Sequence, residues 1–172
     1  VPQTERARPP GSGPRHFVFA PDGQSAYVIS ELSSTIGALS YDAEAGTLEL
    51  IGVQPVLPAD FEGESHCADI GIHPSGRFVY GSNRGHDSIA MFAVDPKSGH
   101  LDLIGHRSTE GATPRNFTIS PDGRFLLVAN QDSDNIVTMP IDPETGALGP
   151  SVAVTEVPTP VCLKFSPAGA TS

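Results

Sequence analysis

The chain is poor in the residue types that several classes of protein and site require. Only two of its 172 residues are lysine and the formal net charge is −10, which argues against nucleic acid and anionic membranes as partners because both need a basic surface. The two cysteines, Cys67 and Cys162, lie in or beside apolar runs. Neither shows disulfide or metal-ligand spacing, so buried free thiols are favoured. We expect no metal and no cofactor.

Long apolar runs are also missing. No run approaches the ~18 residues of a membrane span, and the N-terminus lacks the apolar core of a signal peptide, so a cytoplasmic location is expected. The Gly-x-Ser-x-Gly elbow of a serine hydrolase is absent as well. Ser33 and Ser34 are therefore interpreted as hydrogen-bonding loop residues rather than nucleophiles.

Turn residues, by contrast, are abundant, with 18 glycines and 17 prolines, and they mark a repeat. A block of 28 residues occurs three times without insertion or deletion, at 21–48, 74–101 and 121–148. Each block opens with Pro-x-Gly, carries an isoleucine 15 residues on and an aspartate 21 residues on, and closes with Gly-x-Leu. A fourth copy begins at Pro167. Self-similarity with starts 53, 47 and 46 residues apart predicts a repeat architecture.

Each repeat has the pattern of four short antiparallel strands joined by tight turns, which is the pattern of a propeller blade. We predict an all-β fold, a partial β-propeller of about three four-stranded antiparallel blades plus one extra strand. Propellers close with about four to eight blades, so this is about half of a ring. The expected parts are a disordered or linker arm at 1–12, blades at about 13–57, 63–108 and 114–155, and a final strand at 161–166.

Positions that the repeats share are expected to keep the blade folded. The aspartate that recurs in every block, as Asp42, Asp95 and Asp142, lies in a turn where its side chain can accept backbone hydrogen bonds. Repetition at one turn favours this structural role over catalysis.

Positions that differ between repeats are freer to carry chemistry. Since the first two strands of a blade are antiparallel, the start of one and the end of the other lie at the same edge, so such residues should share one face. Three arginines at one face favour a site for a carboxylate or phosphate. Structural ion pairs at the same places are the alternative interpretation. The differing residues are Arg15, Ala68 and Arg115 before the first strand, and Glu31, Arg84 and Gln131 after the second.

Two histidines adjoin these positions. His16 either points toward the ring axis or packs into the sheet, and His86 is either a solvated loop residue or a site residue. The candidates for substrate binding are His16, His86, Arg115, Asn130 and Gln131.

At these residues the chain resembles a known family. Gly-Pro-Arg-His at 13–16, Glu-Leu-Ser-Ser-Thr at 31–35, the segment 82–89 and the segment 130–136 are similar to the lactonase family of seven-bladed β-propellers, of the 6-phosphogluconolactonase and 3-carboxy-cis,cis-muconate lactonizing enzyme type. The resemblance implies that Arg15, Glu31 and Arg84 are catalytic-site residues, completed by a histidine of a Pro-His-x-His motif. That motif is absent from this sequence, so the chain alone is expected to be inactive.

Three hypotheses for function follow. The first is the C-terminal half of a lactonase-type hydrolase acting on an anionic sugar lactone such as 6-phosphogluconolactone. The second is a cycloisomerase of a carboxylated muconate in the same fold. The third is a non-catalytic half-propeller that binds or assembles, either as a homodimer or with a missing N-terminal half that completes the ring.

Overall fold

The computed structural model describes residues 10–166, which form three four-stranded sheets and one turn of 3₁₀ helix, η1 (Gln131–Ser133). Within each sheet the strands follow chain order and every neighbouring pair is antiparallel. The first sheet holds β1 (Pro14–Phe19), β2 (Ser25–Ser30), β3 (Thr35–Asp42) and β4 (Thr47–Pro55); the second holds β5 (His66–Ile72), β6 (Phe78–Arg84), β7 (Ser88–Val94) and β8 (Leu101–Ser108); the third holds β9 (Pro114–Ile119), β10 (Phe125–Asn130), β11 (Asn135–Pro140) and β12 (Ala153–Glu156).

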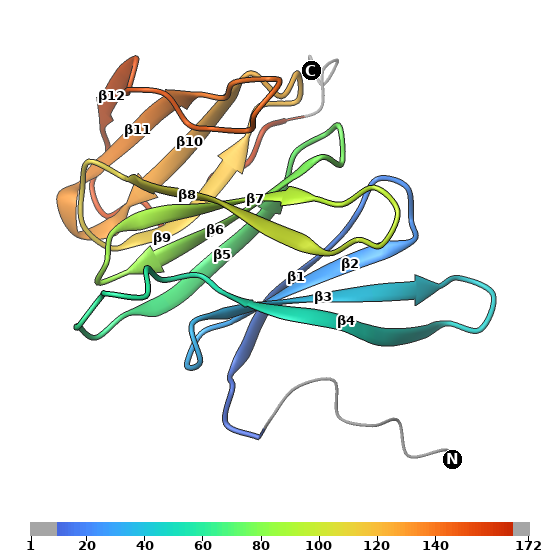
Figure 1. Ribbon diagram of the computed structural model, residues 1–172. Helices are drawn as coiled ribbons and strands as arrows, with labels where there is room; N and C mark the ends of the chain where they lie inside the picture. The colour runs from blue at the N-terminus through green and yellow to red at the C-terminus, as the bar shows by residue number, and fades with distance from the viewer. Residues whose placement is uncertain (1–9, 167–172) are drawn as a thin grey trace.

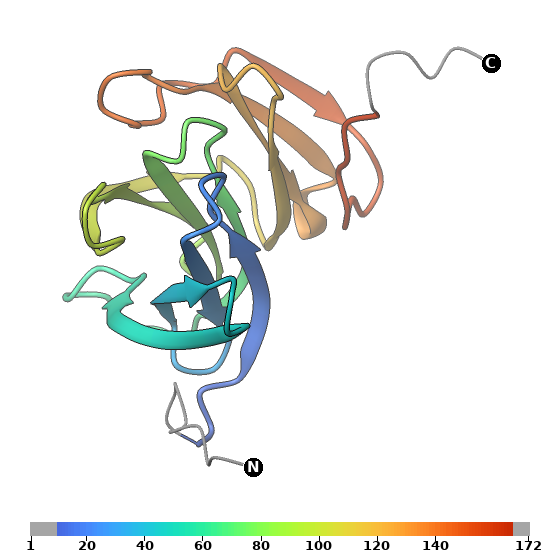
Figure 2. The ribbon, with the colours of Figure 1, turned by 90° about the vertical axis from the view of Figure 1, so that its right-hand side faces the viewer.

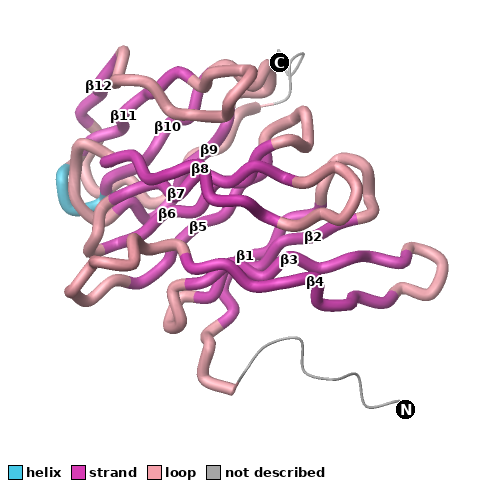
Figure 3. The backbone as a smooth tube through the Cα atoms, viewed as in Figure 1, coloured by secondary structure: helices cyan, strands magenta, loops and turns pink. Residues whose placement is uncertain are grey.

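The three sheets are stacked one after another in chain order, as Figures 1 and 2 show from two sides. The first strands of the sheets lie against one another, β1 with β5 and β5 with β9. Strands account for nearly all of the regular structure (Figure 3). This is the predicted arrangement of propeller blades, and we call the sheets blades 1, 2 and 3.

The apolar core lies between the blades because a single sheet cannot cover both of its own faces. Between blades 1 and 2, Tyr27 and Ile29 pack with Val79 and Phe92 of the second blade. Between blades 2 and 3 a second cluster contains Tyr80, Met91, Phe117, Leu126 and Val137. The second strand of each blade, β2, β6 or β10, is therefore mostly buried by a neighbouring blade.

The turns of the repeat form one edge of each blade, which we call the lower edge. The recurring aspartates behave as predicted there: Oδ1 of Asp95 accepts hydrogen bonds from the backbone of Lys97 and Ser98 at 2.9 and 2.8 Å. The same turn is made at Asp42 and at Asp142. These hydrogen bonds from the backbone hold the pKa of Asp95 below its usual value.

A tyrosine ties each blade to the next at this edge. The Tyr27 hydroxyl donates to the Gly99 carbonyl at 3.1 Å, and the Tyr80 hydroxyl donates to the Gly146 carbonyl at 2.9 Å. Both tyrosines are fully buried, and burial raises the pKa of Tyr27 to about 12, so the donating proton is retained.

The ends of the chain differ in part from the expectation. Of the arm expected at 1–12, residues 1–9 lie outside the described residues, and Ser12 is buried with its carbonyl accepting from Leu32 and Ser33. The segment 161–166 has no strand pairing within the described part of the chain. The segment instead lies beside β9, where the Leu163 amide donates to the Asn116 side chain. Cys162 of this segment is exposed, so the expectation of a buried thiol was wrong there, whereas Cys67 is buried as expected.

Candidate functional site

A β-bulge shapes the start of the first strand in every blade. The ladder shifts register between Pro14 and His16 in blade 1 and between Cys67 and Ile70 in blade 2, and in blade 3 it shifts opposite Arg115. A bulge leaves a residue unpaired and re-aims its side chain. The bulges fall at the edge opposite the repeated turns, which we call the upper edge, where the sequence predicted the site.

Two of the predicted arginines and the predicted glutamate form an ion-paired triad at this edge. Oε2 of Glu31 lies 3.3 Å from Nε of Arg15, and its Oε1 accepts a short hydrogen bond from Nη2 of Arg84. The three side chains are partly exposed, by 19% for Arg15, 33% for Glu31 and 17% for Arg84. Because the residues come from blades 1 and 2, the triad bridges two blades and carries a net charge of +1.

Each arginine of the triad is also fixed by a backbone carbonyl of β5. Nη1 of Arg15 donates to the Ala68 carbonyl at 3.0 Å, and Nη2 of Arg84 donates to the Cys67 carbonyl at 3.2 Å. The guanidinium groups are therefore held in position before any ligand binds. An anion that binds there loses less free energy to ordering the arginine side chains.

The carboxylate of Glu31 is held in its ionised form. Partial burial opposes ionisation, but the hydrogen bond from Arg84 and the charges of Arg84 and Arg15 outweigh it and keep the pKa of Glu31 below its ordinary value. A carboxylate of low pKa is a weak base, so the geometry favours a role for Glu31 in orienting the two arginines over a role as a base.

A second network, not predicted, adjoins the triad. Asp69 of β5 is 7% exposed, and its carboxylate accepts four hydrogen bonds. Oδ1 accepts from Nδ1 of His16 at 2.6 Å and from the Ile70 amide at 2.9 Å, and Oδ2 accepts from the Asn116 side chain and the Phe117 amide. We call His16, Asp69 and Asn116 the Asp69 network; it joins the first strands of all three blades.

The sequence did contain a signal for this network. His16, Asp69 and Asn116 each stand five residues before the proline of a Pro-x-Gly turn, so they occupy one matched position in the three repeats. The position differs in chemistry from blade to blade, as the two positions chosen as site candidates do. Of these three residues, the sequence analysis names only His16 as a site candidate, because it adjoins Arg15.

Two candidates of blade 3 lie at the upper edge but do not join the triad. Arg115 is half-buried in its bulge, and within residues 10–166 its guanidinium makes no hydrogen bond or ion pair. Gln131 begins η1 and donates from its side chain to the adjacent Asp132 at 3.2 Å. Their assignment to substrate binding stays a prediction.

Two further candidates are engaged elsewhere. Asn130 is fully buried, and its amide donates to the Thr109 carbonyl at 3.0 Å and to Asn135 at 2.9 Å, so its contacts are structural. The ring of His86 packs edge-on against Phe61 and His106. The structure thus gives Asn130 and His86 no contact with the triad.

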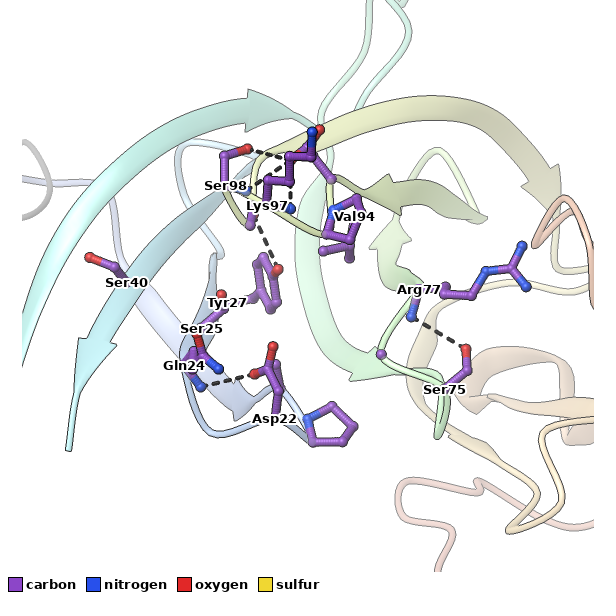
Figure 4. A pocket seen from close by; sticks show the side chains of 16 residues that line it. Asp22, Gln24, Ser25, Tyr27, Ser40, Ser75, Arg77, Val94, Lys97 and Ser98 are labelled. Carbon is purple, nitrogen blue, oxygen red and sulfur yellow. Dashed lines mark hydrogen bonds between the residues drawn. The ribbon is translucent and has the colours of Figure 1, made fainter.

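A hollow of about 300 Å³ lies at the lower edge, away from the triad, between the turns of blades 1 and 2 (Figure 4). The comparable place between blades 2 and 3 is covered by Arg77 and Phe78; the Arg77 guanidinium donates to the carbonyls of Pro143 and Glu144. The repeats place Gln24 and Ser25 at those two positions in blade 1. Shorter side chains explain the hollow without any function.

Residues 10–166 contain neither a cluster of metal ligands nor a membrane-spanning helix. No cluster of three or more His, Cys, Asp or Glu side chains is placed to hold a metal ion. No helix there has the length and apolar character needed to cross a bilayer.

Comparison with known proteins agrees with the propeller blades described above. A family model described as lactonase, 7-bladed beta-propeller, matches residues 1–165. The chain belongs to the lactonase family of seven-bladed β-propellers.

Individual lactonase relatives are similar over most of this chain. A 6-phosphogluconolactonase of Bacillus subtilis is 44% identical over 156 residues, which is 91% of this chain and 45% of the relative. A periplasmic gluconolactonase of Pseudomonas aeruginosa superposes with a TM-score of 0.86 at 41% identity, over 91% of this chain and 43% of that one. A structure described as a putative 6-phosphogluconolactonase of Bacteroides fragilis gives 0.85 at 38% identity, over 92% and 43%.

These matches also give the extent of the chain within its family. The chain spans less than half the length of the relatives it matches. Three blades of a seven-bladed ring agree with that share, as the repeat count predicted.

Proposed function

We propose that this chain supplies the charged part of a lactonase active site, and that the complete ring hydrolyses the lactone of an anionic sugar acid such as 6-phosphogluconolactone. The observation that carries the proposal is the triad, in which two arginines from different blades are held at one edge by Glu31 and by backbone carbonyls. The lactonase names of the relatives support the reaction type.

The triad suits this reaction on chemical grounds. Attack of water on a lactone carbonyl passes through a tetrahedral oxyanion, and fixed cationic donors stabilise that charge, with a single donor contributing about 10²–10³ in rate. The same guanidinium groups can hold a phosphate or carboxylate of the substrate through charge-assisted hydrogen bonds. Glu31 keeps both arginines in place and stays ionised.

The need for a complete ring rests on exposed apolar surface. Phe17 and Phe19 of β1 are 41% and 50% exposed, although the matched strands β5 and β9 are covered by neighbouring blades. We propose that further blades of the family cover this face, and that the chain is inactive without them.

The test compares two arginines at opposite ends of one strand, since Arg77 precedes β6 and Arg84 is its last residue. Arg84 lies at the upper edge in the triad, and Arg77 lies at the lower edge. The assay uses this chain alone and in a complete ring, made by fusing it to the remaining blades of the Bacillus subtilis relative. We expect the ring to hydrolyse 6-phosphogluconolactone, Arg84→Ala to lower kcat/KM by about 10²–10³, and Arg77→Ala to leave it within about 2-fold.

The substrates in the assay separate the alternatives. Gluconolactone without phosphate and a carboxylated muconate are tested beside 6-phosphogluconolactone. Turnover of the muconate alone would replace the lactonase proposal by the cycloisomerase. A folded ring that turns over none of the three, or equal rates for both arginine variants, would contradict the proposal.

A further inference from the structure

The triad provides no group that readily accepts a proton from water. Glu31 is kept ionised by two arginines and is a weak base, and the arginines themselves do not give up protons at neutral pH. Lactone hydrolysis requires such a group, because water is a poor nucleophile until its proton is removed. The question is which side chain of the upper edge can take that proton.

His16 has the required chemistry and position. Its Nδ1 lies 2.6 Å from Oδ1 of Asp69, which is an acceptor, and its Nε2 lies 2.9 Å from Nη1 of Arg15, which is a donor. The carboxylate requires a proton on Nδ1, and the guanidinium requires a lone pair on Nε2. The hydrogen bonds thus define one neutral tautomer whose basic nitrogen faces the triad.

Asp69 is well placed to fix that ring. Its other three hydrogen bonds come from the Ile70 and Phe117 amides and from Asn116, whose own oxygen accepts from the Leu163 amide at 2.6 Å. A buried carboxylate so fully bonded cannot rotate without losing several of them. The His16 side chain is 45% exposed.

We infer that His16 is the general base of the proposed lactone hydrolysis, and that Asp69 is the positioning residue that sets its tautomer and stabilises its protonated form. This inference rests on the lactonase function proposed above. An oxygen held by the Arg15 guanidinium lies near Nε2, within the direct or one-water reach of a general base.

The proposed reaction needs only the lactone and water, and His16 is regenerated at its end. Nη1 of Arg15 first turns from Nε2 of His16 to the carbonyl oxygen of the lactone, which frees the lone pair of Nε2. Nε2 then takes a proton from water while the water oxygen bonds to the lactone carbonyl carbon, and the carbonyl oxygen becomes an oxyanion beside the arginines. Collapse of this intermediate breaks the bond between the carbonyl carbon and the ring oxygen. The proton passes from Nε2 to the departing oxygen, leaving an open-chain hydroxy acid and neutral His16, after which the acid loses its proton to solvent.

Several charged groups face or adjoin His16. Asp69 of β5 accepts from Nδ1 of its ring, and Arg15 of β1 donates to Nε2. Beyond Arg15 lie Glu31 and then Arg84 of β6. Asn116 of β9 is neutral.

The first test needs no variant and no activity. Nitrogen-15 NMR of this chain at neutral pH is expected to show His16 protonated on Nδ1 and unprotonated on Nε2. His73 at the lower edge, which contacts Ser75 and the Gly123 carbonyl, is the reference ring. A proton on Nε2 of His16, or on both nitrogens, would overturn the inference.

The second test measures kinetics in the complete ring. Glutamine keeps a donor and an acceptor but is not a base, so His16→Gln is expected to lower kcat by about 10²–10⁴, with KM within about 3-fold and the acid limb of the pH profile removed. Asp69→Asn is expected to lower kcat in the same way, and His73→Gln to change nothing. If the wild-type ring is active and His16→Gln keeps its rate and pH profile, the base is another group. An inactive wild-type ring would instead refute the proposed lactonase function itself.

Discussion

The upper and lower edges of these blades are built by the same repeat but differ in what they hold together. At the lower edge the residues recur from blade to blade: an aspartate turn in all three and a buried tyrosine in blades 1 and 2. At the upper edge the matched positions differ, and the differing residues bond to one another across blades. The comparison teaches that in this repeat the shared positions maintain the architecture and the divergent positions form the candidate site.

The largest expected difference between the two edges is in how much kcat/KM falls when an arginine is replaced by lysine. Lysine keeps the charge of Arg15 but cannot reproduce the contacts that its Nε and Nη1 make with Glu31, His16 and Ala68. Arg15→Lys in the complete ring is expected to lower kcat/KM by about 10²-fold.

Arg124→Lys is the matched control, since Arg124 is 73% exposed at the lower edge and bonds to Asp122 beside it. Kinetic assays of both variants check the contrast. A loss of activity in Arg124→Lys equal to that in Arg15→Lys would remove the distinction between the edges.

The tyrosine contact should affect stability rather than activity. Tyr80→Phe removes the hydrogen bond to the Gly146 carbonyl and leaves that buried oxygen without its donor, which is expected to cost about 1–3 kcal/mol of unfolding free energy. Urea unfolding of this chain measures the loss, and the kcat of the complete ring should stay unchanged. Unaltered stability would show that the contact between blades 2 and 3 does not depend on the hydroxyl.

Acid titration tests the electrostatics of the upper edge. Because the folded-state pKa of Glu31 is lowered, its ion pairs contribute stability above its unfolded-state pKa, and this contribution is lost as the pH falls through the folded-state value. Carbon-13 NMR of the Glu31 carboxyl should therefore show a midpoint below the ordinary ~4.3 of glutamate. Arg84→Ala should raise the midpoint, whereas Arg77→Ala should not move it. A Glu31 midpoint at or above the ordinary value would contradict the assigned pairing.

Filling the hollow at the lower edge has the smallest expected effect. Changing Gln24 to Arg and Ser25 to Phe copies the residues that cover the matched place between blades 2 and 3. Cavity filling of this kind typically adds about 0.5–2 kcal/mol, so the Tm of this chain should rise by a few degrees, with activity of the complete ring unchanged. A loss of activity would mean that the hollow serves the reaction.

Much of the fold followed from the sequence because the repeat is exact in length. The Pro-x-Gly turns and the aspartates fixed where strands end, and the observed blades begin and end within a few residues of the predicted ones. The segment 161–166 was expected as a strand, yet it pairs with no strand among residues 10–166. The repeat pattern predicts which residues are suited to a strand, but whether that strand pairs depends on a second segment.

The site was predictable in part. Arg15, Glu31 and Arg84 came from comparing matched positions, and the structure brings these three together. Asp69 and Asn116 occupy the same matched position as His16, but the repeat does not show that the three side chains meet, because that contact depends on how the blades pack. Asn130 was selected for its place in the loop, but whether an amide faces a ligand or a buried carbonyl depends on packing that sequence does not show.

The cytoplasmic location stays a prediction. Relatives of this chain include an enzyme whose name places it in the periplasm.

The measurement that tests the account most directly is a map of where the reaction product binds. Titration of this isotope-labelled chain with 6-phosphogluconate, followed by NMR, is predicted to shift the signals of Arg15, Arg84 and His16 at the upper edge and to leave those of Arg77 and Tyr80 unmoved. Shifts confined to the lower edge, around the hollow between blades 1 and 2, would contradict the assignment of the site to the charged triad.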